Sequence, residues 1–216
     1  MTSHPPITLR QPLTSTPSPP QPSPPPLSWL TGSWNVTHST LPMWKKSRNV
    51  RITYTALPTR TNGLVEIDDV VSYQGVNKSK KRVSTVRGVD KASSPPSSSP
   101  SAPAPATTEA QEVEREEKAS PSYTWRGRGL LMIATSKWEI LGWGDEAETG
   151  NQWVVTFFQK TLFTPAGVDV YARRGQLRGE TVERIKGALE GLGGEVGTLA
   201  GAMFEVAFDG EREGEV

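Results

Sequence analysis

A series of short segments in which apolar and polar residues alternate is the feature that most constrains the fold of this chain. Segment Val50–Leu57 alternates strictly, with Tyr54 among its apolar residues. Segment Gly32–Thr40 shows the same pattern, with Trp34 and His38 in one phase. Successive side chains of a β-strand point to opposite faces of the sheet, so a period of two residues is typical of half-buried strands. The chain is therefore predicted to be mainly β.

Further segments with strand character follow these two. They are Gly63–Gln74, Arg82–Val89, Tyr123–Gly129, Ile133–Gly142, Gln152–Leu162 and Val168–Arg174. Most connections are of turn length, as at Asn62-Gly63, and this favours an up-and-down antiparallel barrel of about eight strands over a Greek-key sandwich. A closed barrel of that size has room inside for one small ligand.

The hydrophobic period changes near the C-terminus. Val182, Ile185 and Leu189 recur at helical spacing, and Gly193 follows the run as a terminator. These residues predict an amphipathic C-terminal helix that packs on another part of the fold. The segment 202–208 is a candidate for a short closing strand.

Composition divides the chain into one domain and three polar segments. Most of the 19 Pro fall in residues 1–27 and 93–121, which contain few aromatic residues. Such segments bury too little apolar surface to offset their ordering entropy. We expect residues 1–27 to form a disordered Pro-rich arm, residues 93–121 a disordered insertion and residues 210–216 a frayed acidic tail. The domain is then the barrel of residues 28–209.

Charge and cysteine content narrow the range of partners. The chain has 24 Lys and Arg against 23 Asp and Glu, for a formal net charge of +1, so no overall field favours nucleic acid. With 0 Cys, disulfides and thiol chemistry are excluded, which fits a reducing compartment. No run approaches the roughly 18 apolar residues of a membrane span, and the N-terminus lacks the apolar core of a secretion signal. We therefore expect a cytoplasmic protein with no membrane span.

A Gly-x-Trp motif, Gly32-Ser33-Trp34, opens the first strand. The order of this motif, an eight-strand meander, a late helix and a closing strand resembles the lipocalin and wider calycin pattern, in particular intracellular and fungal lipocalin-like proteins. The resemblance implies a calycin-like β-barrel with Trp34 at its closed end and an arginine from the end of the last barrel strand packed across it. Arg174 is the matching candidate, and Arg173 is the second. Such a cation–π pair is a structural lock worth about 0.5–2 kcal/mol.

The aromatic content indicates what the barrel is suited to hold. All 7 Trp lie between Trp29 and Trp153, and a small barrel needs few bulky residues to fill it. A surplus favours a wall that stacks against a planar or polyene ligand. The residues expected to line the ligand site are His38, Tyr54, Trp138 and Phe157.

His38 and Glu139 each have two interpretations. A lone His is more often a hydrogen-bonded core residue than a haem or metal ligand, and with 0 Cys no metal-binding spacing occurs, so no metal or cofactor is expected. In the simpler interpretation Glu139 pairs with Lys137 on the outer wall. Directed inward, the carboxyl of Glu139 would have a raised pKa and would anchor the polar head of a ligand.

These observations favour the binding of a small, largely apolar molecule inside the barrel. One alternative is a substrate-shaping enzyme of secondary metabolism, a cyclase or isomerase, which works through conformational restraint and one or two hydrogen bonds. No phosphate loop, dinucleotide fingerprint or nucleophile elbow occurs in the sequence. A second alternative is an interaction module whose Pro-rich arm binds a protein partner through an aromatic groove.

Overall fold

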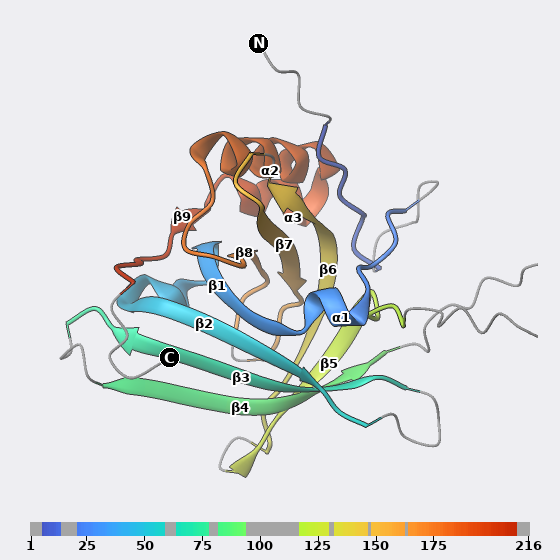
Figure 1. Cartoon of the computed structure of the whole chain (residues 1–216), viewed down its shortest axis with the longest axis vertical. Helices are drawn as coiled ribbons and strands as arrows, with labels where there is room; N and C mark the ends of the chain where they lie inside the picture. The colour runs from blue at the N-terminus through green and yellow to red at the C-terminus, as the bar shows by residue number, and fades with distance from the viewer. Residues whose placement is uncertain are drawn as a thin grey trace, which may run out of the picture.

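The chain forms a closed barrel of eight antiparallel strands, which confirms the predicted fold class (Figure 1). The computed structural model describes residues 6–13, 21–58, 64–77, 82–93, 117–129, 132–146, 148–162 and 164–210. Strands adjacent in sequence pair with one another, and β1 closes the barrel by pairing with both β2 and β8. The barrel strands are β1 (Gly32–Ser39), β2 (Ser47–Ala56), β3 (Glu66–Gly75), β4 (Val83–Ala92), β5 (Ser122–Gly127), β6 (Thr135–Glu146), β7 (Asn151–Phe158) and β8 (Gly167–Ala172).

The other described elements are a helical turn before β1, a 3-10 helix between β1 and β2, and the C-terminal elements. They are α1 (Leu27–Leu30), η1 (Pro42–Lys46), α2 (Gly179–Leu192), α3 (Gly194–Ala200) and β9 (Phe204–Glu205). The short strand β9 lies outside the barrel and pairs with β1. Within the described ranges, no helix is long and apolar enough to cross a membrane.

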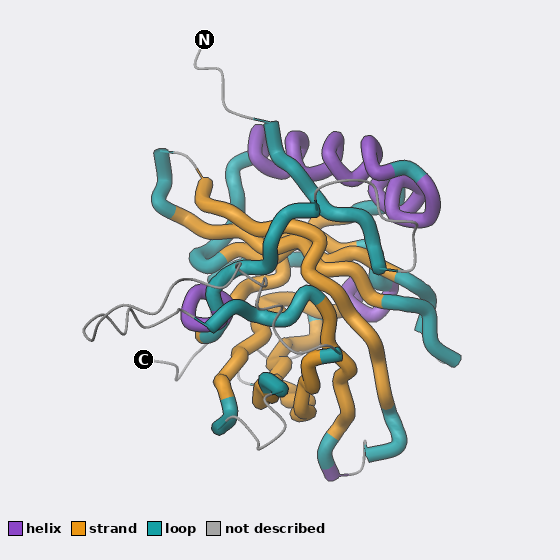
Figure 2. Tube along the Cα trace, turned by 90° about the vertical axis from the view of Figure 1, so that its right-hand side faces the viewer, coloured by secondary structure: helices purple, strands orange, loops and turns teal. Residues whose placement is uncertain are grey.

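Helices α2 and α3 pack together on one side of the barrel (Figures 1 and 2). Ile185 and Leu189 of α2 are fully buried and share an apolar cluster with Val168 and Val170 of β8. Every residue of β8 is consequently buried, on both faces of the strand. The predicted C-terminal helix is confirmed, and it ends at Gly193, whose φ of 65° favours glycine.

Residues 6–13 lie along the outer face of β6. The backbone N–H of Arg10 donates to the Leu141 carbonyl at 2.7 Å, and the Leu9 side chain is buried. A Cβ atom at Gly142 would lie 2.3 Å from Leu9 Cδ2, so the glycine makes room for this side chain. This part of the N-terminal arm therefore belongs to the packed domain.

The sequence predicts a disordered arm over residues 1–27, but its described parts, residues 6–13 and 21–27, pack against the barrel. Residues 21–27 also contact the barrel: Trp143 Nε1 donates to the Ser23 carbonyl at 2.9 Å, and the Leu27 side chain is buried. Buried apolar contacts of this kind offset the entropy of ordering the chain. The remaining parts of the arm (1–5 and 14–20), residues 94–116 of the expected insertion and residues 211–216 of the tail lie outside the described residues.

Candidate functional site

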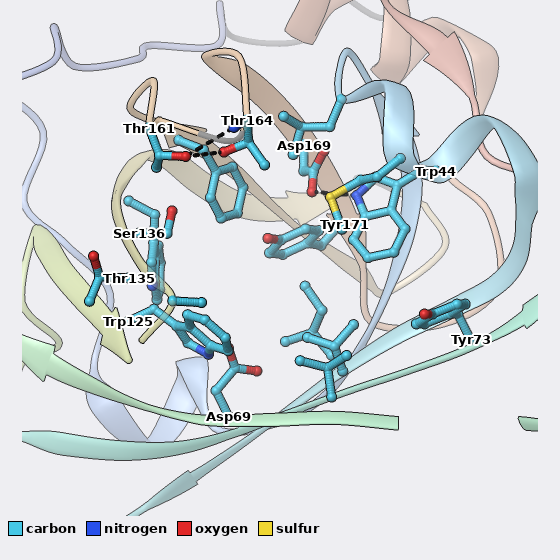
Figure 3. A pocket seen from close by; sticks show the side chains of 18 of the residues that line it. Trp44, Asp69, Tyr73, Trp125, Thr135, Ser136, Thr161, Thr164, Asp169 and Tyr171 are labelled. Atoms are coloured by element: carbon cyan, nitrogen blue, oxygen red, sulfur yellow. Dashed lines mark hydrogen bonds between the residues drawn. The ribbon is translucent and has the colours of Figure 1, made fainter. Parts of the chain in front are cut away.

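The barrel encloses a cavity of about 270 Å³ that is open at one end. Figure 3 shows the side chains of residues that line it. The residues around the mouth belong to segments that connect or begin strands. They are Leu41, Met43, Trp44, Ala134, Thr135, Ser136, Thr161 and Thr164. The wall is mainly apolar, and seven elements each contribute one aromatic ring to it: Trp44, Tyr54, Tyr73, Trp125, Trp138, Phe158 and Tyr171. The side chains of the barrel thus leave an apolar space of the size of a small organic molecule.

The opposite end of the barrel is closed by Trp34. This residue has no exposed surface, and its indole Nε1 donates to the Leu30 carbonyl of α1 at 2.7 Å. The guanidinium carbon of Arg173 lies 3.5 Å from the centroid of the Trp34 ring. Arg173 Nη1 also donates to the backbone carbonyls of Thr31 at 3.0 Å and Ser33 at 3.2 Å. Trp34 and Arg173 together fix α1 across the closed end.

The second candidate, Arg173, and not Arg174, supplies the cation over Trp34. The backbone N–H of Arg174 donates to Asn151 Oδ1 at 2.9 Å. Tyr171 packs with Trp34 and Trp138 in the apolar cluster inside the barrel, here called the interior cluster. Arg173 is two residues after Tyr171, so both fall on the inner face of β8 and its extension. The phase of Arg174 is that of the residues that face the helices.

Asp69 of β3 is one of two carboxyl residues in this mainly apolar wall. The residue is 7% exposed, and the Trp125 ring lies beside it (Figure 3). Burial raises the pKa of Asp69 to about 7, the neighbouring charge of Asp68 adds to the rise, and a hydrogen bond with Trp125 opposes it. The carboxyl of Asp69 therefore changes its charge near neutral pH.

Asp169 of β8 is the second carboxyl that lines the cavity. It accepts hydrogen bonds from Ser39 Oγ at 2.5 Å and from Trp44 Nε1 at 3.2 Å. Burial raises the pKa of Asp169 to about 7, and these two hydrogen bonds oppose the rise. The same bonds connect β8, β1 and η1 at the mouth of the cavity.

A buried stack of rings forms the wall near Asp90. Trp138 stacks on Tyr54, with ring centroids 5.7 Å apart, and on Tyr123, with centroids 4.7 Å apart. Its indole Nε1 donates to Asp90 Oδ1 at 2.7 Å. Asp90 is fully buried, and burial raises the pKa of its carboxyl. The hydrogen bond and the stack fix the orientation of the Trp138 ring.

The structure brings two of the expected lining residues, Tyr54 and Trp138, into the cavity wall. Phe157 instead packs in the cluster beneath α2 and α3, and its neighbour Phe158 lines the cavity. Glu139 is on the outer wall, but its cation is Arg10, at 3.0 Å, and not Lys137. Of the two interpretations of Glu139, the structure therefore matches the outward one with a different partner.

His38 is half-buried and does not line the cavity. The pairing of β1 with β8 shifts register between Val36 and His38, so the side-chain phase changes after Val36. Burial lowers the pKa of His38, and the charges of Glu205 and Glu183, which belong to β9 and α2, oppose this. These neighbours place the imidazole of His38 on the outer side of the barrel.

Sequence reasoning did not single out Asp169 or Asp90 as site residues. The available signal was an isolated acidic residue within an apolar strand, as in the sequence Val168-Asp169-Val170. Asp68 and Asp69 are adjacent in β3, so their side chains point to opposite faces of the sheet. In the structure Asp69 lines the cavity, and Asp68 pairs with Arg128 at 3.0 Å.

We expect the buried Asp69 carboxyl to make stability depend on pH. Its ordinary pKa is 3.8 and its pKa in the folded chain is about 7, so the folded state binds more protons between these values. The contribution of protonated Asp69 to the free energy of unfolding is complete below about pH 4 and is lost as pH rises through about 7. The free energy of unfolding falls over this range by up to about 1.4 kcal/mol per pH unit. Urea titrations of the wild type and Asp69→Asn across this range should show a shallower decline for the variant.

The control for this experiment is Asp68→Asn. It removes the same charge from the adjacent, outward-facing position and should retain most of the slope. Identical pH dependence in the wild type and Asp69→Asn would show that Asp69 does not hold a proton in the folded state.

Comparisons with known proteins agree with this architecture. No protein-family model matches the sequence, and no curated protein matches it. Among solved structures, the chain is similar to apocrustacyanin C1 at 11% sequence identity and a TM-score of 0.51, over 85% of this chain and 79% of that chain. It is also similar to lobster apocrustacyanin A1 at 11% identity and a TM-score of 0.47, over 84% and 78%. The likeness to apocrustacyanin C1 and the closed eight-strand barrel together show a lipocalin-like, calycin fold, as the sequence resemblance implied.

Proposed function

We propose that this protein binds a small, largely apolar molecule inside the barrel. The observation that carries the proposal is the cavity of about 270 Å³, which is open at one end and has a mainly apolar wall that includes several aromatic rings. Interiors are normally packed to a density that leaves few voids larger than a water molecule. A space of this size, with an apolar wall and two carboxyls, has the character of a ligand site.

Filling the cavity should weaken ligand binding without creating a void elsewhere. Val71 lines the cavity from β3, so Val71→Trp would place an indole in the ligand space. We expect the affinity for an uncharged fluorescent probe, N-phenyl-1-naphthylamine, to fall by about tenfold or more. The probe is titrated at equal protein concentrations, and melting curves check that each variant is folded.

Val70→Trp is the matched control for this substitution. Val70 precedes Val71 in β3, so its side chain points to the other face of the sheet. Probe affinity should be close to that of the wild type in this variant. If the wild type binds no apolar probe, or if the two variants lose binding equally, the cavity is not the binding site.

A second candidate function is proton transfer in a substrate-shaping enzyme. The specific observation in its favour is that Asp69 and Asp169 both have pKa values of about 7 in an apolar cavity, where a carboxyl can give or take a proton near neutral pH. A compound that binds the barrel would be incubated with the wild type and with Asp69→Asn, then analysed by mass spectrometry and NMR. Recovery of the unchanged compound from the wild type supports binding alone.

The third possibility, a protein partner bound through the Pro-rich arm, has less support. Leu9, Arg10 and Leu27 of the arm are buried against the barrel and its adjoining segments. Those parts of the arm would have to leave these contacts before a groove-type partner could bind them.

A further inference from the structure

One carboxyl oxygen of Asp69 is an unused hydrogen-bond acceptor inside the cavity, although the side chain also has a hydrogen bond with Trp125. Its Oδ1 atom is buried and has no hydrogen-bond partner among the described residues, although the side chain lines the cavity. A buried carboxyl oxygen without a partner costs free energy, so native proteins nearly always satisfy such an atom with a protein group, a water or a ligand. A hydrogen-bond donor that enters the cavity would therefore satisfy Asp69 Oδ1.

No described side chain of the cavity wall supplies a positive charge. The lining contains the carboxyls of Asp69 and Asp169 but no Lys, Arg or His among the described residues. Behind the wall, Asp90 is a third buried carboxyl near Asp69, and its Oδ2 also lacks a hydrogen-bond partner in the described structure. Asp68 is directed to the outer face, where Arg128 pairs with it at 3.0 Å. A cation that pairs with Asp69 would thus come from the ligand.

The rings around the carboxyls suit a positively charged group. Trp125 lies beside Asp69, and the Tyr171 ring lies between Asp69 and Asp169 (Figure 3). The face of an aromatic ring attracts an ammonium group, and the attraction increases when water is excluded. Carboxyls combined with aromatic faces bind an organic cation better than they bind a neutral or anionic molecule.

We propose that the ligand of this cavity is an apolar molecule that carries a protonated amine, with the ammonium group paired to Asp69 and the apolar body in contact with the surrounding rings. This inference rests on the proposed ligand-binding function and adds the chemical class of the ligand. Asp169, already engaged by Ser39 and Trp44, adds negative potential near the mouth when its carboxyl is ionised, above about pH 7.

Binding of the amine should be linked to the proton on Asp69. Without ligand the pKa of Asp69 is about 7, because the carboxyl is buried and Asp68 is close. An ammonium group stabilises the ionised carboxylate and lowers this pKa. Below neutral pH, binding therefore releases a proton from Asp69, and the affinity for the amine rises as pH increases through about 7. A neutral ligand should show neither effect.

Two probes of similar shape, one charged and one neutral, measure the effect of the ligand's positive charge on binding. 1-Naphthylmethylamine and 1-naphthylmethanol share one ring system and differ in the ammonium group. Isothermal titration calorimetry near pH 8 is expected to show a preference of about tenfold or more for the amine in the wild type. Titrations near pH 6 in buffers of different ionisation enthalpy should show proton release for the amine alone.

Asp69→Asn should remove both the preference and the proton release while the alcohol still binds. Asp68→Asn, which deletes the same charge from the opposite face of β3, should keep the preference. Melting curves of each variant at the same pH values confirm that the proteins are folded.

The outcomes separate this inference from the proposed function. If the wild type binds the alcohol as tightly as the amine, or Asp69→Asn keeps the preference, the amine proposal is overturned and ligand binding by the cavity stands. If neither probe binds the wild type, the ligand-binding function and the amine proposal are both overturned.

Discussion

Trp34→Ala is expected to lower the free energy of unfolding by about 3–5 kcal/mol, the usual cost of truncating a large buried aromatic residue. Trp34 is fully buried at the closed end of the barrel. Its ring contacts Arg173 on one side and lies 5.1 Å from the ring of Trp29. The substitution would also leave the Leu30 carbonyl without the indole donor that binds it at 2.7 Å. A cavity and a lost hydrogen bond would therefore occur together.

Urea titration with a fluorescence or circular dichroism signal measures this loss. Trp34→Phe is the matched variant, because it keeps a ring beneath Arg173 and removes the indole N–H. It should cost less than the alanine variant. A loss below about 1 kcal/mol for Trp34→Ala would contradict a structural role for the closed end.

Alternation in several strands, together with turn-length connections, was sufficient to predict an up-and-down barrel, because alternate residues of those strands are buried in the interior. β2 is an example, with Ile52 and Tyr54 buried in the interior cluster. The same reasoning placed the amphipathic helix, because Ile185 and Leu189 recur at helical spacing and are buried together. Here local pattern and global fold agree.

The alternation does not show which face is inside where both faces of a strand are buried. α2 and α3 cover the outer side, so Val168 and Val170 of β8 and Phe157 of β7 look like lining residues but pack against the helices. For this reason the alternation favoured Phe157 and Arg174 as inward-facing residues, whereas Phe158 and Arg173 occupy the inner positions. A one-residue change of phase moves every side chain to the opposite face.

Register shifts are a second cause of wrong phase. In β1 the shift between Val36 and His38 turns His38 outward. In β6 a shift between Ile140 and Gly142 allows Trp138 and Trp143, which differ in phase by sequence, to contact the same interior cluster. A bulge depends on pairing with a neighbouring strand, and no local residue pattern in these segments marks it.

The N-terminal segment is ordered by specific contacts that have no periodicity. Leu9 fits over Gly142, and Arg10 reaches carbonyl groups and a carboxylate on β6 and the segment before β5. Composition predicts disorder for a Pro-rich stretch because such a stretch has few apolar residues to bury. Composition does not reveal the stabilisation from one buried ion pair and the hydrogen bonds around it.

That ion pair leads to the second large effect, because Arg10→Ala is expected to cost about 3–5 kcal/mol of unfolding free energy. Arg10 and Glu139 are 5% and 1% exposed and lie 3.0 Å apart. Arg10 Nε also donates to the Ile140 carbonyl at 2.5 Å, and Nη2 donates to the Pro121 carbonyl at 2.6 Å. Alanine would leave the carboxylate of Glu139 buried without its cation.

The double variant Arg10→Met with Glu139→Gln is the control, because it removes both charges and keeps similar side-chain volumes. It should be more stable than Arg10→Ala, since the cost of an isolated buried charge exceeds that of replacing the whole pair. Deleting residues 1–13 should destabilise the barrel to a similar extent as Arg10→Ala, as measured by urea titration. If the deletion leaves stability unchanged, Leu9 and Arg10 contribute no net free energy, and the arm is an appendage to a barrel that is complete from Leu27 onward.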